Sequence, residues 1–137
     1  MKQTLDEESI KGLVAYRIQR SKETILEARL MIDQGYLNGA INRLYYACYY
    51  IVIALFIKNG MSAQTHSGTK QMLGLHFVVN WKLSPKTSSI YATLFEKRHS
   101  SDYDDFAYYD IETLEKLYPQ ANEFIETIEK LLKDWFV

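Results

Sequence analysis

"LNGAINRLYYACYYIVIALFIK", residues 37–58, carries apolar or aromatic side chains on nearly every face of a helix. A helix without a polar face is stable in water only when neighbouring elements cover it on all sides. Asn59-Gly60 follows the run and is a typical helix stop. The sequence therefore predicts that residues 37–58 form the central, most buried helix of a helical bundle.

Two long segments with helical spacing lie on either side of this run in the chain. Residues 5–34 carry an apolar stripe that Ser21 completes, and Gly35 is a natural stop. Residues 110–136 carry a second stripe, in which Pro119 predicts a kink or a division into two helices. We expect these two segments to cover the central helix.

Two shorter helices are expected between the central helix and the last one. The first runs from about Ser67 to Val79, although two glycines weaken it. The second begins near Ser84-Pro85 and ends close to residue 98. No segment alternates like a strand. The prediction is a single domain over residues 1–137 with an all-α, up-and-down bundle of about five helices.

The composition is that of a globular domain: 137 residues, 47% hydrophobic and 24% charged. A chain of this length can bury a core without disulfides or metals. The single cysteine, Cys48, cannot form an internal disulfide, and one cysteine with scattered histidines cannot build a structural zinc site. We therefore expect no metal site and no cofactor.

The sequence indicates a cytoplasmic protein with no membrane role. Residues 1–12, "MKQTLDEESIKG", lack the apolar core of a secretory signal, and the run "IVIALFI" at 51–57 is too short to span a bilayer. The formal net charge of −1 offers no general attraction to phosphates. A nucleic-acid role therefore needs a local cluster of Arg and Lys, assembled from two subunits.

The densest set of reactive side chains is "RHSSDYDDF", residues 98–106. Arg98 can hold a phosphate with two parallel N–H bonds. Asp102 is four residues further on and would pair with Arg98 on one helix face. Tyr103 can donate to a phosphate or accept a covalent modification. These three residues are the main candidates for catalysis, and Arg98 and Tyr103 also for nucleotide or RNA binding.

The same stretch has a plainer interpretation as a helix end with an exposed ion pair. His99 is adjacent to Arg98, so on a helix it points about 100° away from it. Asp104 and Asp105 offer oxygen ligands, but we interpret them as a solvated loop and expect no metal there.

Two further clusters precede this stretch. The tyrosines of "RLYYACYY", residues 43–50, are interpreted as core or dimer packing. Arg43 needs a carboxylate, a cleft or a ligand, which makes it a candidate nucleotide-binding residue. In "THSG", residues 65–68, Thr65 or Ser67 is expected to cap a helix. His66 is expected to be a surface histidine and remains a weaker catalytic candidate.

Taken together, these pieces resemble the HEPN domain family, in particular its small stand-alone bacterial and archaeal members. The resemblance rests on "AINRLYYACYY" at 40–50, "THSG" at 65–68, "HFV" at 76–78 and "LFEKRHSSDYDDF" at 94–106. It implies an up-and-down helical bundle, commonly a homodimer, often encoded beside a minimal nucleotidyltransferase as a toxin–antitoxin pair. Active members are metal-independent endoribonucleases in which an Arg is followed after four to six residues by His.

This chain departs from that signature, because Tyr103, Asp104 and Asp105 occupy the positions where His is expected. Arg98 and Tyr103 match positions of the family's motif, whereas no residue of this chain matches its histidine. RNA cleavage would then need Asp102 or His66 as its base. Three hypotheses stay open: a nucleotide- or RNA-facing toxin, a non-catalytic partner of a nucleotidyltransferase that uses Tyr103, and a purely structural helical homodimer.

Overall fold

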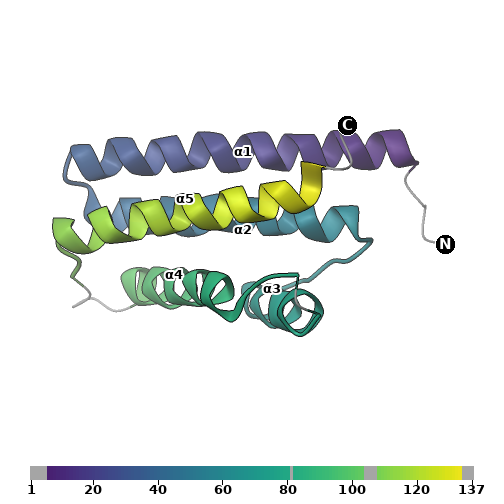
Figure 1. Ribbon diagram of the computed structural model, residues 1–137. Helices are drawn as coiled ribbons and strands as arrows, with labels where there is room; N and C mark the ends of the chain where they lie inside the picture. The colour runs from purple at the N-terminus through teal and green to yellow at the C-terminus, as the bar shows by residue number, and fades with distance from the viewer. Residues whose placement is uncertain (1–5, 81, 104–107, 134–137) are drawn as a thin grey trace.

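The computed structural model describes residues 6–80, 82–103 and 108–133, and these form an all-α bundle without strands (Figure 1). Its helices are α1 (Glu7–Asp33), α2 (Leu37–Lys58), α3 (His66–Leu73), α4 (Pro85–Tyr103) and α5 (Ile111–Lys133). A short π-helical segment, Gly74–Val78, continues α3. The predicted fold class and the number of helices are confirmed.

The helix α2 is the centre of the bundle, as its sequence predicted. It packs against α1, α4 and α5, and the long helices α1 and α5 run beside it while α3 and α4 lie on its other side (Figure 1). Half of its residues are buried, among them Ile41, Leu44, Ile51, Val52 and Phe56. Burial of side chains of this kind contributes about 1.5–3 kcal/mol each. The core therefore forms around α2.

By length and composition, α2 would also be able to cross a membrane, and it is the one such helix among the described residues. The run 51–57 is too short to span a bilayer, but the whole helix Leu37–Lys58 is long enough. In the bundle, however, 61% of the apolar window is buried against the other helices. That burial is typical of the core helix of a soluble bundle.

The packing of α1 on α2 depends on a buried serine. Ser21 has no exposed surface, and its hydroxyl donates a hydrogen bond to the backbone oxygen of Ala47 on α2, 2.6 Å away. A small side chain lets the two backbones approach closely, and the hydrogen bond satisfies the buried hydroxyl. Ser21 therefore belongs to the apolar stripe of α1, as the sequence predicted.

The helix ends follow local capping chemistry. Asp6 accepts a hydrogen bond from Ser9 N at the start of α1, and Thr65 accepts one from Gly68 N at the start of α3. Gly35 ends the α1–α2 turn with a φ of 81°, which an L side chain rarely adopts. The expected cap at "THSG" is confirmed for Thr65.

Two expected details differ in the structure. Pro119 lies inside α5, which is assigned as one helix over Ile111–Lys133, so a division in two is wrong. The helix α4 continues to Tyr103, so residues 98–103 are helical and do not begin a loop. Asp104 and Asp105, interpreted above as a solvated loop, lie outside the described residues.

Enlarging Ser21 tests whether close α1–α2 packing holds the bundle together. We expect Ser21→Leu to lower the free energy of unfolding by about 3 kcal/mol, because the added volume has no space. Ser21→Ala should cost about 1 kcal/mol for the lost hydrogen bond. Urea unfolding followed by circular dichroism measures both.

Ala15→Leu is the matched control, since Ala15 is exposed on the same helix. It should change stability by less than about 0.5 kcal/mol. Equal stability of the Ser21→Leu and Ala15→Leu variants would contradict the packing argument.

Candidate functional site

The guanidinium of Arg98 lies against a wall of tyrosine rings on α2. Its Cζ atom is 5.3 Å from the ring centroid of Tyr45 and 5.4 Å from that of Tyr46. These distances allow a cation–π attraction to both rings. Asp102, one turn further along α4, holds the guanidinium from the other side, with its Oδ2 3.1 Å from Arg98 Nε. The predicted Arg98–Asp102 pair is confirmed.

The Arg98–Asp102 contact is an ion pair and not a well-aligned hydrogen bond. Arg98 Nε is buried and has no hydrogen-bond partner among the described residues, even though the Asp102 oxygen is close. The side chain of Arg98 is only 16% exposed. The guanidinium of Arg98 has further N–H donors besides Nε, and these are suited to binding an anion.

His66, the first residue of α3, packs against the same tyrosine wall. Its ring centroid is 4.7 Å from that of Tyr49, 5.6 Å from that of Tyr45 and 5.8 Å from that of Tyr46. The expectation of a surface histidine is wrong, because His66 is half-buried among these rings. The THSG turn places His66 against these rings. No residue near His66 in the sequence indicates its contacts with tyrosines.

A hydrogen-bonded chain of two phenols orients the His66 ring. Tyr45 Oη is 2.7 Å from His66 Nδ1 and 3.2 Å from Tyr91 Oη on α4. Nε2, the other ring nitrogen, has no hydrogen-bond partner in the described parts of the chain and is left for a ligand. The proton positions along this chain depend on the His66 tautomer.

Burial disfavours the charged forms of the histidine and of two tyrosines in the cluster. Burial, followed by the positive charge of Arg98, lowers the pKa of His66 from its ordinary value. Burial raises the pKa of Tyr45 to about 12, against the opposing effects of Tyr91 and Arg98. Burial also raises the pKa of Tyr91. The lowered pKa favours the neutral imidazole, which is the form that can accept a proton.

Arg43 joins the cluster from its α2 side. Its Cζ is 5.6 Å from the ring centroid of Tyr46, which it shares with Arg98. Its Nη1 lies 3.3 Å from Glu27 Oε2, and its Nη2 donates to Asn42 Oδ1 at 2.7 Å. Arg43 and Asn42 both need polar partners on this apolar helix. They mainly bond to each other, and Glu27 is a second partner of Arg43.

Tyr103 lies apart from this cluster. It is 72% exposed, and its ring contacts that of His99, with 4.7 Å between the centroids. The two residues are one turn apart on α4, on a different face from Arg98. His99 is exposed, and it contacts Tyr103 and not the Arg98 side of the helix. Within one chain, then, Arg43, Arg98, Asp102 and His66 come together and Tyr103 does not.

The structure adds two residues that sequence reasoning missed. Tyr45 was interpreted as packing, and its ring is indeed buried, but its hydroxyl holds His66. Tyr91 has no exposed surface and lies 46 positions from Tyr45 in the chain. Its role depends on how α4 packs on α2, and no local pattern indicates it.

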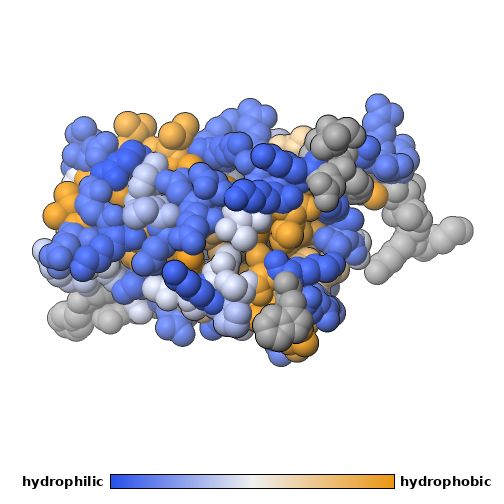
Figure 2. All heavy atoms as spheres, in the orientation of Figure 1, coloured by the Kyte–Doolittle hydropathy of each residue, from blue (hydrophilic) through white to orange (hydrophobic). Residues whose placement is uncertain are grey.

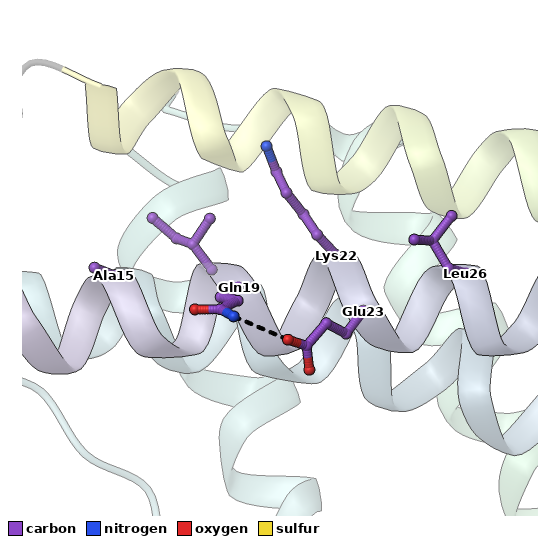
Figure 3. A pocket seen from close by; sticks show the side chains of 6 residues that line it. Ala15, Gln19, Lys22, Glu23 and Leu26 are labelled. Carbon is purple, nitrogen blue, oxygen red and sulfur yellow. Dashed lines mark hydrogen bonds between the residues drawn. The ribbon is translucent and has the colours of Figure 1, made fainter.

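A shallow apolar hollow on α1 does not belong to the cluster (Figure 3). Ala15, Gln19, Lys22, Glu23 and Leu26 line it together with Ile18, and all come from a single helix. In it, Gln19 donates to Glu23 at 3.0 Å, and Lys22 reaches toward α5, where it pairs with Glu129. No group of three or more potential metal ligands occurs within residues 6–80, 82–103 and 108–133.

The arrangement can do two things chemically. A guanidinium held against aromatic rings can bind a phosphate, and a neutral imidazole beside it can accept a proton. The ring faces around them suit the stacking of a base. The fold and site thus define a small helical bundle with an arginine–histidine cluster on a tyrosine wall.

Comparison with known proteins gives the family. The HEPN domain model matches residues 14–131. The chain is 31% identical over 122 residues to a UPF0332 protein of Thermotoga maritima, which covers 89% of this chain and 92% of that one. It is 25% identical over 117 residues to "Putative toxin MJ0605" of Methanocaldococcus jannaschii, covering 85% and 87% of the two chains. The chain belongs to the HEPN domain family.

The pKa of His66 reports whether Arg98 lies beside it in solution. We expect the ring signals of His66 in an NMR titration to give a pKa below the ordinary 6.5. Arg98→Gln should raise that pKa, because it removes a nearby positive charge. Lys116→Gln, which removes a charge from an exposed position on α5, should leave it unchanged. If the pKa of His66 is the same in the Arg98→Gln variant and in the wild type, Arg98 does not lie beside His66 in solution.

Proposed function

We propose that this protein binds RNA through Arg43, His66, Arg98 and Asp102, here called the Arg98 cluster. We propose further that it acts as the toxin of a toxin–antitoxin pair with a minimal nucleotidyltransferase. The observation that carries the proposal is that Arg98 and His66, 32 positions apart, meet on the rings of Tyr45 and Tyr46. Family membership and relatives whose names include the word toxin support it.

In this proposal His66 takes the place of the histidine missing after Arg98. Its Nε2 removes the proton of an RNA 2′-hydroxyl, and the oxygen then attacks the adjacent phosphorus. Arg98 stabilises the charge that develops on the phosphate oxygens. The bond from phosphorus to the 5′-oxygen breaks, and the leaving oxygen takes a proton from protonated His66. The products are a 2′,3′-cyclic phosphate and a free 5′-hydroxyl.

Asp102 has a different role in this scheme. Its carboxylate is paired with Arg98, with Oδ2 3.1 Å from Arg98 Nε, and so is already engaged with the guanidinium. We therefore assign Asp102 to positioning the guanidinium, and no longer as the alternative base. Arg43, which also lies near the Tyr46 ring, binds a neighbouring phosphate or base.

Cleavage of a single-stranded RNA in the presence of EDTA tests the catalytic proposal. We expect Arg98→Gln to lower the rate at least about 100-fold, the usual effect of removing a group that stabilises transition-state charge. Lys116→Gln should cleave at the wild-type rate. Equal rates for the Arg98→Gln and wild-type proteins would exclude Arg98 from the reaction.

A second function, as a non-catalytic partner that a nucleotidyltransferase modifies, is favoured by the exposure of Tyr103. Its ring is 72% exposed on the last turn of α4, where an enzyme can reach the hydroxyl. This proposal does not need the missing histidine. It also fits the separation of Tyr103 from the Arg98 cluster.

Co-expression with a minimal nucleotidyltransferase, followed by intact-mass measurement, tests this second function. We expect a nucleotide adduct that Tyr103→Phe abolishes. Tyr108→Phe is the matched control, since Tyr108 is 82% exposed and should leave the adduct intact. An adduct that survives Tyr103→Phe, or none at all in a stable complex, would count against it.

The homodimer expected from the family resemblance remains part of the proposal. Leu26 and Leu30 on α1 are 62% and 65% exposed, and apolar patches interrupt the mainly hydrophilic surface over that helix (Figure 2). Exposed apolar patches are common at subunit contacts. Equilibrium sedimentation at micromolar concentration distinguishes a dimer from a monomer.

A further inference from the structure

We propose that single-stranded nucleic acid binds along a strip that leads from the Arg98 cluster to the far side of α1. This arginine–tyrosine strip consists of Tyr16, Arg17 and Arg20 on α1, Tyr46 and Tyr50 on α2, and Arg98 on α4. The inference rests on the proposed function and extends it, because it assigns binding to residues well away from Arg98 and His66.

The strip is continuous through ring contacts. Arg17 Cζ lies 5.6 Å from the Tyr16 ring centroid and 5.8 Å from that of Tyr50. The rings of Tyr50 and Tyr46 are 6.0 Å apart, and Arg98 lies 5.4 Å from Tyr46. Arginines therefore lie toward both ends of the strip, with the rings of Tyr50 and Tyr46 between them.

Arg20 reinforces the middle of the strip. Its Cζ is 5.4 Å from the Tyr50 ring centroid, and its Nη1 pairs with Glu23 at 3.0 Å. The guanidinium groups of Arg17 and Arg20 thus both lie near the Tyr50 ring. Two cations close together raise the local positive potential, which favours an anionic ligand.

Arg17 is the strongest sign of a ligand on the strip. Arg20, Arg43 and Arg98 each have a carboxylate partner, whereas Arg17 has none among the described residues. Its Nε is also buried with no hydrogen-bond partner there. A guanidinium without a carboxylate partner keeps Nη donors available, and these can bind a phosphate oxygen.

The arrangement suits a polynucleotide in particular. Arginine side chains can bind successive phosphates, and tyrosine faces can stack on bases without regard to sequence. Tyr16, at the outer end, is 53% exposed and so has a free ring surface. A mononucleotide reaches only one end of the strip. A longer strand reaches Arg98 and Arg17 together.

Fluorescence anisotropy with two probes tests the strip. The probes are labelled oligouridylate of twelve nucleotides and, by competition, uridine 3′-monophosphate. We expect Arg17→Gln to weaken binding of the oligonucleotide about five- to tenfold and to lower the slope of log affinity against log salt by about 0.7, the value for one phosphate contact on a single strand. Binding of the mononucleotide should not change.

Three comparisons make the result specific. Arg98→Gln should weaken the binding of both probes. Arg17→Lys should retain most of the oligonucleotide binding. Lys116→Gln should bind both probes like the wild type. Thermal unfolding of each variant checks that the fold is intact. Loss of oligonucleotide binding in Arg17→Gln with an unchanged melting temperature would support the strip.

Other outcomes overturn the inference in distinguishable ways. If Arg17→Gln binds the oligonucleotide like the wild type while Arg98→Gln does not, the strip is wrong and the proposed function stands. If the wild type binds neither probe, both the strip and the proposed function are wrong. If Arg17→Gln changes only the sedimentation of the protein, the strip contacts a second copy of this chain and not a nucleic acid.

Discussion

Burial of α2 on every side is the constraint on which the rest of the structure depends. Its apolar residues leave no face that water can cover, so α1, α4 and α5 must all pack against it. Close packing on one side depends on Ser21, whose hydroxyl is satisfied by Ala47 O. Tyr46, Tyr49 and Tyr50 on α2 are only partly buried, and together with the buried Tyr45 their rings form the floor of the candidate site.

The position of these tyrosines on α2 determines where the candidate site forms. Tyr45, Tyr46, Tyr49 and Tyr50 lie on adjoining faces of α2, so rings and hydroxyls point toward α1, α3 and α4 at once. His66 and Arg98 arrive from two other helices and share the rings of Tyr45 and Tyr46. Low exposure then strengthens the electrostatic contacts among them, because water screens buried charges less.

The departure from the HEPN signature also has a structural meaning. A histidine a few residues after the arginine would be placed by a single helix end. Here His66 approaches from the start of α3, and the pair of phenols Tyr45 and Tyr91 fixes its ring. A cation and an imidazole therefore come together here through the packing of separate helices and not through spacing within one helix. Tyr103, which does follow Arg98 locally, remains on the outside of α4.

The sequence by itself determined the helices, the central place of α2, the cap at Thr65 and the Arg98–Asp102 pair. Each depends on spacing within one helix or one turn, where neighbours in the chain are neighbours in space. It did not determine the continuity of α5 through Pro119, the burial of His66 or the separation of Tyr103 from Arg98. Only the tertiary structure decided these, because contacts between residues 21 or 46 positions apart depend on how whole helices pack, and packing is a property of all side chains at an interface together.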